Sequence, residues 1–185
     1  IYEDIIGPLD KTLSEIIFFG ICTDTGYFRF LDSDTSDVFS AISRLVENGA
    51  NPRATYTEIN SGKPFSTRKL LGVMLSKSEQ YFNGKLIVTY ETLEDTKLFG
   101  KDGRDSDSLY QLLLSVDEVQ AVLFVRQDTD KTCTAGFRSK DAIDVSTIAA
   151  KFGGGGHKNA AGLSTEGTID TLLPQIIKEF EKVLN

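Results

Sequence analysis

The stretch KFGGGGHKNAAG, residues 151–162, contains four consecutive glycines, the single histidine of the chain and a second group of small residues. Glycine has no Cβ, so the main chain of such a run can approach a ligand closely. Successive main-chain amides can also point together toward a phosphate or another anion. The alternative is a glycine turn beside an exposed histidine without a function. The residues alone favour the anion site only slightly.

The sequence around this stretch alternates between strand and helix patterns. Three runs, KLIVTYET (85–92), AVLFVRQ (121–127) and TCTAGFRSK (132–140), predict strands, the last two paired across the DTDK turn. Apolar residues at helical spacing predict a helix that begins near residues 105–108. Asp144 is expected to cap a short helix over 144–152. A final helix is predicted to carry Pro174 in its first turn or at a kink. This alternation predicts an α/β domain at residues 84–185, with a small mixed sheet and flanking helices.

The first third of the chain has helical rather than alternating patterns. Apolar residues from Leu9 to Ile21 follow helical spacing after Pro8, which suits a first turn, and a second helix is predicted over 37–47. Residues 27–31 are predicted to be a short extended piece between them. The turn-rich NSGKP then precedes a helix that Ser66 is expected to cap. We therefore expect a helical domain remnant at 1–62, a linker helix at 63–83 and the α/β domain at 84–185.

Two charged residues stand out beside the glycines and His157. Asp24, in the motif TDTG (23–26), is a candidate ligand for a hard metal ion, although an isolated Asp-Thr-Gly more often forms a turn or a cap. Arg138 ends the strand that leads toward the glycine run, and guanidinium groups bind phosphate through paired hydrogen bonds. An ordinary surface arginine is the commoner explanation for any single case.

The composition excludes several classes of protein. Apolar residues make up 40% of the chain, and the longest apolar run, Ile16–Cys22, is far shorter than the ~20 residues that span a bilayer. A net charge of −7 argues against unspecific binding of nucleic acid. Cys22 and Cys133 do not form a CxxC pair, which favours a reducing cytoplasmic location with both thiols in the core.

Taken together, these motifs resemble a known family. FGGGGHKNAAG and the preceding FRSK–DVSTIAAKF are similar to the signature of the DHH-associated domain, subtype 1. Upstream, GICTDTGYFRF resembles the last metal-binding motif of DHH phosphoesterases, and the two motifs follow one another in the order of that family. The subgroup most similar is the bacterial oligoribonuclease and 3′-phosphoadenosine 5′-phosphate phosphatase type.

The resemblance implies that the parent enzyme has a catalytic part and a separate substrate-binding part. In that family an N-terminal domain binds two Mn²⁺ ions and hydrolyses a phosphoester, and the C-terminal domain holds a short RNA or a nucleotide phosphate. By resemblance, Asp24 matches a manganese ligand. The positions that match substrate-holding residues are Arg138, Gly154, Gly155, Gly156 and His157.

The chain departs from the family in one respect, because a single histidine cannot supply the Asp-His-His motif. We therefore expect the C-terminal portion of a longer enzyme, inactive alone but able to bind nucleotides, and a homodimer is compatible with the sequence. Three alternatives stay open: a cyclic-dinucleotide phosphodiesterase or RecJ-like exonuclease, a non-catalytic tRNA-binding module as in alanyl-tRNA synthetases, and a structural α/β domain whose glycine run is only a turn.

Overall fold

The computed structural model describes residues 7–100, 104–140 and 142–184. The chain divides after Lys63 into two compact units, each with its own hydrophobic core. We call them the N-terminal and the C-terminal unit. Within the described residues, no helix is long and apolar enough to cross a membrane.

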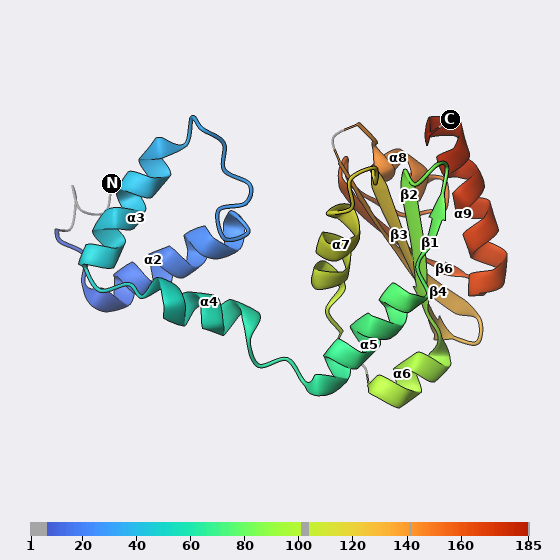
Figure 1. Ribbon diagram of the computed structural model, residues 1–185, viewed down its shortest axis with the longest axis horizontal. Helices are drawn as coiled ribbons and strands as arrows, with labels where there is room; N and C mark the ends of the chain where they lie inside the picture. The colour runs from blue at the N-terminus through green and yellow to red at the C-terminus, as the bar shows by residue number, and fades with distance from the viewer. Residues whose placement is uncertain (1–6, 101–103, 141, 185) are drawn as a thin grey trace. The chain divides into compact units, whose positions relative to one another are not determined.

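The N-terminal unit contains the helices α2 (Lys11–Asp24), α3 (Ser36–Glu47) and α4 (Pro52–Asn60), which Figure 1 shows in blue to teal. Asp10 caps α2, its Oδ1 accepting a hydrogen bond from Leu13 N at 2.8 Å, so Pro8 lies outside the first turn where we had predicted it. The two predicted helices are confirmed, but α4 was not predicted. Asn51 caps it and Pro52 occupies its first turn.

The segment after the TDTG motif differs from the prediction. Residues 27–30, within the predicted extended piece 27–31, form a turn, and Gly26, Tyr27 and Phe28 have φ of 57°, 56° and 74°. Tyr27 N donates a hydrogen bond to Cys22 O at 2.7 Å, which folds the chain back on α2. The aromatic ring of Phe28 lies 6.3 Å from that of Phe18. These apolar contacts with the core of the unit offset the strain of a left-handed backbone at two aromatic residues.

The C-terminal unit contains a six-stranded mixed sheet, which confirms the predicted fold class. Its strands are β1 (Glu79–Tyr81), β2 (Leu86–Glu91), β3 (Ala121–Thr129), β4 (Thr132–Ser139), β5 (Gly155–His157) and β6 (Ala160–Glu166). They lie in the order β1-β2-β3-β4-β6-β5, with β2 and β3 parallel and all other neighbours antiparallel. The strands β2, β3 and β4 were predicted. The strands β5 and β6 were not, because glycine and alanine rarely form strands.

Helices cover part of both faces of this sheet. They are α5 (Phe65–Ser76), α6 (Leu93–Phe99), α7 (Ser106–Leu114), α8 (Val145–Ala150) and α9 (Ile169–Leu184). Side chains of α5 and α7 pack with Val122 and Phe124 of β3 on one face. Those of α8 and α9 pack with Leu123 and Phe137 on the other, and Figure 1 shows α7 and α9 on opposite sides of the sheet.

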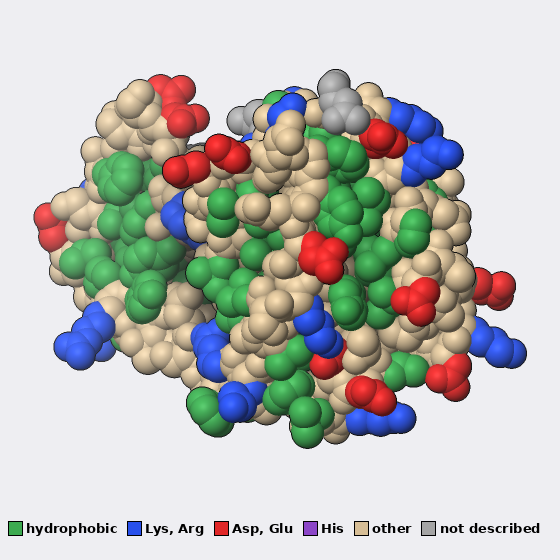
Figure 2. Space-filling model, turned by 45° about the vertical axis from the view of Figure 1, so that its right-hand side comes forward, with side chains coloured by type: hydrophobic (Ala, Val, Ile, Leu, Met, Phe, Trp, Pro, Cys, Tyr) green, Lys and Arg blue, Asp and Glu red, His purple; other side chains and the backbone are tan. Residues whose placement is uncertain are grey.

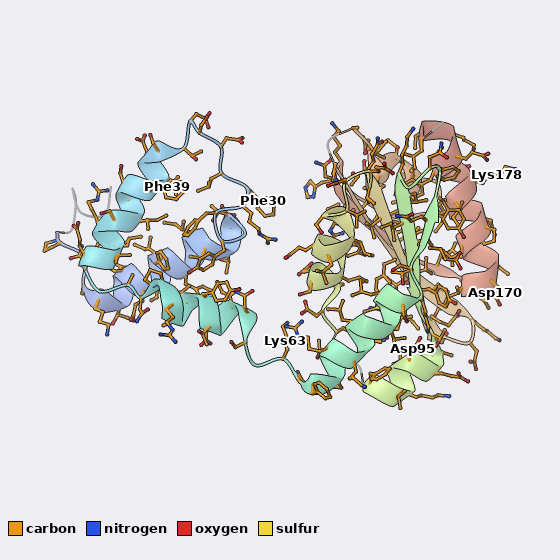
Figure 3. The ribbon with its side chains drawn as sticks, viewed as in Figure 1. Phe30, Phe39, Lys63, Asp95, Asp170 and Lys178 are labelled. Atoms are coloured by element: carbon orange, nitrogen blue, oxygen red, sulfur yellow. The ribbon has the colours of Figure 1, made fainter. Side chains whose placement is uncertain are left out.

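The predicted linker helix corresponds to α5. The helix begins at Phe65 after Pro64, so Ser66 lies inside it and is not its cap. Leu70 and Met74 are 1% and 3% exposed in the core that α5 shares with β2, β3 and α7. The helix is thus a layer of the C-terminal unit. The unpredicted α6, which carries Asp95 (Figure 3), is tied to it by Lys77, because Lys77 Nζ lies 2.5 Å from Asp95 Oδ2.

Candidate functional site

The strand register places Arg138 and His157 on one face of the sheet. Arg138 on β4 pairs with Ala160 on β6, and Ala160 pairs with His157 on the edge strand β5. Directly paired residues of antiparallel strands point to the same face. Neighbouring strands are about 4.8 Å apart, so roughly 10 Å separate the Arg138 and His157 backbones. His157 is exposed and Arg138 is partly buried.

A row of glycines lies beside this pair on the same face. Gly136 of β4 pairs with Gly162 of β6, which pairs with Gly155 of β5. We call these three residues the glycine row. A Cβ at Gly155 would meet no atom within 4 Å, and at Gly162 the nearest atom is Ala135 O at 3.4 Å. Neither residue has a left-handed φ. Packing therefore does not require glycine at these two positions, and the bare backbone is open to an outside group.

The glycine run itself divides into residues with different roles. A Cβ at Gly154 would collide with Gly162 O and lie 2.5 Å from the Cβ of Leu163. Gly156 has a φ of 146°, and a Cβ there would lie 2.5 Å from Ala160 O. Both glycines are required for the close packing of β5 on β6. Gly155, between them, is not, so the structural turn and the open surface occur in the same run.

Arg138 is held by an aromatic side chain that the sequence did not single out. Its guanidinium carbon lies 4.6 Å from the centre of the Tyr110 ring, and its Nη1 donates a hydrogen bond to Phe137 O at 3.0 Å. Tyr110 belongs to α7 and is 28 positions away in sequence, so no local pattern could reveal the contact. The arrangement fixes the guanidinium at the border of the glycine row.

Hydroxyl and charged groups line the opposite side of the glycine row. Arg126, Thr134 and Ser164 pair across β3, β4 and β6 on the same face. Arg126 Nε donates to Asp128 Oδ1 at 2.8 Å, and the Thr134 hydroxyl also donates to Asp128. Burial alone would raise the pKa of Asp128, but these hydrogen bonds outweigh it and lower the pKa. The carboxylate therefore stays ionised and neutralises Arg126.

The three rows together form a surface that we call the open face. Rows on one face of a strand are about 7 Å apart, so the open face spans roughly 13 Å from Arg138 to Thr134, the scale of one nucleotide. It offers Arg138 and His157 along one side, bare backbone in the middle, and the Arg126–Asp128 pair with two hydroxyls along the other. Among the described helices, only α8 contacts β5 and β6 closely, and it lies on the opposite face with α9.

The structure places Asp24 in the N-terminal unit, as the last residue of α2. Its side chain is exposed, and the neighbouring Thr23 and Thr25 hydroxyls donate to helix carbonyls at 3.0 and 2.6 Å rather than facing outward. Of the residues with described positions, no three His, Cys, Asp or Glu side chains gather closely enough to hold a metal ion. Asp24 would supply one ligand at most, so the described residues do not fit a complete manganese site.

The surface charge is consistent with a local rather than a general anion site. Acidic residues outnumber basic ones by 27 to 20. On the face shown in Figure 2, Lys and Arg side chains are scattered among acidic and hydrophobic ones and form no continuous field. Recognition of an anion on the open face would therefore depend on a few placed groups.

Comparisons with known proteins agree with the fold. The chain is 34% identical over 148 residues to the bifunctional oligoribonuclease and PAP phosphatase NrnA of Thermus thermophilus, an alignment that covers 80% of the chain and 43% of that protein. It is 28% identical over 178 residues to the A-adding tRNA nucleotidyltransferase of Aquifex aeolicus, covering 96% of the chain and 20% of that protein.

A solved structure extends this likeness to three dimensions. The exopolyphosphatase-related protein from Bacteroides fragilis has a TM-score of 0.80 and 28% sequence identity, over 95% of this chain and 50% of the other. The chain thus spans half or less of the length of each of these relatives. The model of the DHHA1 domain matches residues 83–185, which include every residue of the open face. The resemblance found in the sequence is confirmed: the chain belongs to the DHHA1 domain family.

Proposed function

We propose that this chain is the C-terminal, substrate-binding part of a manganese-dependent phosphoesterase that hydrolyses short oligoribonucleotides, 3′-phosphoadenosine 5′-phosphate or both. The observation that carries the proposal is the open face, where Arg138 and His157 border the glycine row and packing does not require glycine at Gly155 and Gly162. The relative from Thermus thermophilus, named as an oligoribonuclease and PAP phosphatase, supports the substrate class.

The geometry suits a nucleotide that lies across the three rows. The Arg138 guanidinium would bind a phosphate through charged hydrogen bonds, and the exposed His157 would donate a second contact from about 10 Å away along the row. The sugar or base would then rest on Gly162 and Gly155, where no side chain interferes. Such a surface binds the part of the substrate that does not react and so positions a terminal phosphate elsewhere.

Hydrolysis itself would require residues beyond those described here. In the proposed enzyme, Asp24 contributes one manganese ligand and an N-terminal catalytic part supplies the others. The N-terminal unit has apolar side chains in keeping with such a neighbour. Ile16 and Phe19 are 63% and 41% exposed, and both line a hollow of about 400 Å³ together with Ala54. We propose that the catalytic part covers this surface.

The test measures binding of fluorescently labelled diribonucleotide and of 3′-phosphoadenosine 5′-phosphate to this chain. A hydrogen bond to a charged group is worth about 1.5–3 kcal/mol, so Arg138→Ala and His157→Ala should each weaken binding about 10- to 100-fold. Lys178→Ala is the control, because Lys178 is exposed on α9 (Figure 3) and α9 packs on the opposite face. Unchanged affinity in both site variants, or no binding by the wild type, would overturn the proposal.

A second experiment addresses activity. The chain alone, with Mn²⁺ added, is expected not to hydrolyse a diribonucleotide, because no group of described residues could hold the ions. Hydrolysis at the rate of a complete enzyme would contradict this expectation. Competition by unlabelled cyclic dinucleotides in the binding assay separates the preferred substrate class from the cyclic-dinucleotide alternative.

One observation favours a second candidate function, that of an RNA-binding module without chemistry. The alignment with the A-adding tRNA nucleotidyltransferase covers 96% of this chain and so includes most of both units. Under this alternative the open face would bind one end of a tRNA. Binding of tRNA at least tenfold tighter than of the diribonucleotide would favour it over the phosphoesterase proposal.

A further inference from the structure

Tyr110 reaches the open face from α7, a helix that contributes none of the residues predicted from the sequence. Its side chain is 6% exposed, and its ring lies edge-on to Phe124 of β3, with 6.4 Å between the ring centres. Tyr110 and Phe124 belong to the same buried cluster as the apolar side chains of α5. The ring is therefore fixed by the core and cannot move freely with a ligand.

The hydroxyl of Tyr110 occupies the start of the glycine row. A Cβ at Gly136 would collide with Tyr110 Oη, so Gly136 is the residue that admits this oxygen to the surface of the sheet. Across all described residues, no hydrogen-bond partner of this hydroxyl is found, and it is not one of the fully enclosed oxygens. The hydroxyl of a buried tyrosine usually has a partner. One that lacks a partner beside a bare, accessible backbone is placed to bind a ligand.

The ring of Tyr110 also determines where the guanidinium of Arg138 lies. The guanidinium stacks on the ring at 4.6 Å, and its Nη1 donates to Phe137 O. Within the described part of the chain, no acceptor is found for its other N–H groups, which leaves them available to a ligand beside the hydroxyl. Arg138 lies two residues beyond Gly136 on the same strand. The Arg138 guanidinium and the Tyr110 hydroxyl therefore serve positions about 7 Å apart on one face of the sheet.

The hydroxyl acts as a donor at neutral pH. Burial raises the pKa of Tyr110 to about 12, although the nearby Arg138 acts in the opposite direction. The phenol therefore remains protonated over the physiological range, and an oxygen atom of a ligand is its matching partner.

We propose that Tyr110 is a specificity-determining residue of the open face, whose ring positions Arg138 and whose hydroxyl donates a hydrogen bond to an oxygen of a nucleotide lying on the glycine row. This inference rests on the proposed function, since it concerns the same surface. It adds a residue from a different element and a defined role for Gly136.

The test compares two substitutions at this position in the binding assay described above. Tyr110→Phe keeps the ring and removes the hydroxyl, and should weaken binding of the diribonucleotide about 3- to 10-fold, the size of a neutral hydrogen bond. Its midpoint of urea unfolding should match that of the wild type. Tyr90→Phe is the matched control, because Tyr90 packs against the core on the opposite face.

The positioning role of the ring is tested by a double-mutant cycle. Tyr110→Leu should weaken binding more than Tyr110→Phe, and Arg138→Ala should then add less in the Tyr110→Leu background than in the wild type. A purely structural role predicts additive losses. The same assay with the 2′-deoxy diribonucleotide identifies the acceptor of the Tyr110 hydrogen bond. If Tyr110→Phe no longer weakens binding of this probe, the acceptor is the ribose 2′-hydroxyl. If the loss of affinity persists, the acceptor is another oxygen of the ligand.

The outcomes separate the two proposals. Wild-type affinity in Tyr110→Phe together with additive losses in the cycle would overturn the role of Tyr110 and leave the proposed function intact, provided that Arg138→Ala and His157→Ala still weaken binding. Failure of the wild type to bind either probe would overturn both.

Discussion

Two neighbouring glycines, Gly154 and Gly155, should differ in how far substitution by alanine destabilises the protein. In Gly154→Ala, the new Cβ would collide with Gly162 O and lie 2.5 Å from Leu163 Cβ, and both of these atoms belong to β6. Ordinary contacts begin at about 3.5 Å, so the edge strand would have to move by about 1 Å. Overpacking of this kind costs about 1–3 kcal/mol, and we expect about 2 kcal/mol because a backbone carbonyl cannot rotate away.

Gly155→Ala is the matched control within the same run. Its Cβ would project into open space, and its φ lies outside the left-handed region. The free energy of unfolding should therefore change by no more than about 0.5 kcal/mol in either direction, since alanine also restricts the unfolded chain. Binding should nevertheless weaken if a nucleotide lies on the glycine row.

The assay is urea unfolding followed by far-ultraviolet circular dichroism. With an m-value of about 2 kcal/mol per molar urea, Gly154→Ala should lower the midpoint of the C-terminal unit by about 1 M, and Gly155→Ala should leave it in place. Equal midpoints for the two variants, or a larger loss in Gly155→Ala, would refute the assignment of a packing role to Gly154 and an open position to Gly155.

Three further predictions concern stability and reactivity. Asp95→Asn should destabilise the C-terminal unit by about 1 kcal/mol at pH 7. Burial tends to raise the pKa of Asp95, but hydrogen bonds from Lys77 and Thr92 outweigh it and lower the pKa. This stabilisation is therefore lost as the pH falls below about 4. A difference in urea midpoint between variant and wild type that is the same at pH 7 and pH 3 would contradict this prediction. Arg104→Met should lower the free energy of unfolding in urea by about 2–4 kcal/mol, because Glu91 is 1% exposed and would lose its ion pair at 2.6 Å. The double variant Glu91→Leu/Arg104→Met should lose less stability. An unchanged stability of Arg104→Met would contradict a stabilising role of this pair. Cys133 is fully buried and burial raises the pKa of its thiol, so it should react with Ellman's reagent only after unfolding, and rapid reaction in the native protein would show that the core is open.

Local patterns were sufficient for the elements whose residues carry their own signal. The β-branched runs of β2 and β3 and the alternation along β4 predicted strands, and Asp144 predicted the start of α8, where its Oδ1 accepts from Ser146 N at 3.0 Å. These features depend on residues within a few positions of one another. The motifs that border the glycine run were likewise enough to predict the family.

Other elements could not be found in this way because distant contacts decide them. The turn after TDTG is left-handed because Tyr27 and Phe28 pack on other helices of the N-terminal unit, and no neighbour in sequence specifies that choice. The hairpin of β5 and β6 is rich in glycine and alanine, and its strand conformation is imposed by the pairing of β6 with β4 and of β5 with β6.

The sequence by itself predicted that a glycine run, one histidine and one arginine form a common site, since their order and spacing are visible in the chain. Only the tertiary structure decided which glycines support packing and which leave the surface open, because a Cβ is tolerated or refused by atoms of another strand. It also brought Tyr110 to Arg138 and Gly136, across helix α7 and strand β4. A contact between a helix and a sheet depends on how the two layers pack, which no local pattern records.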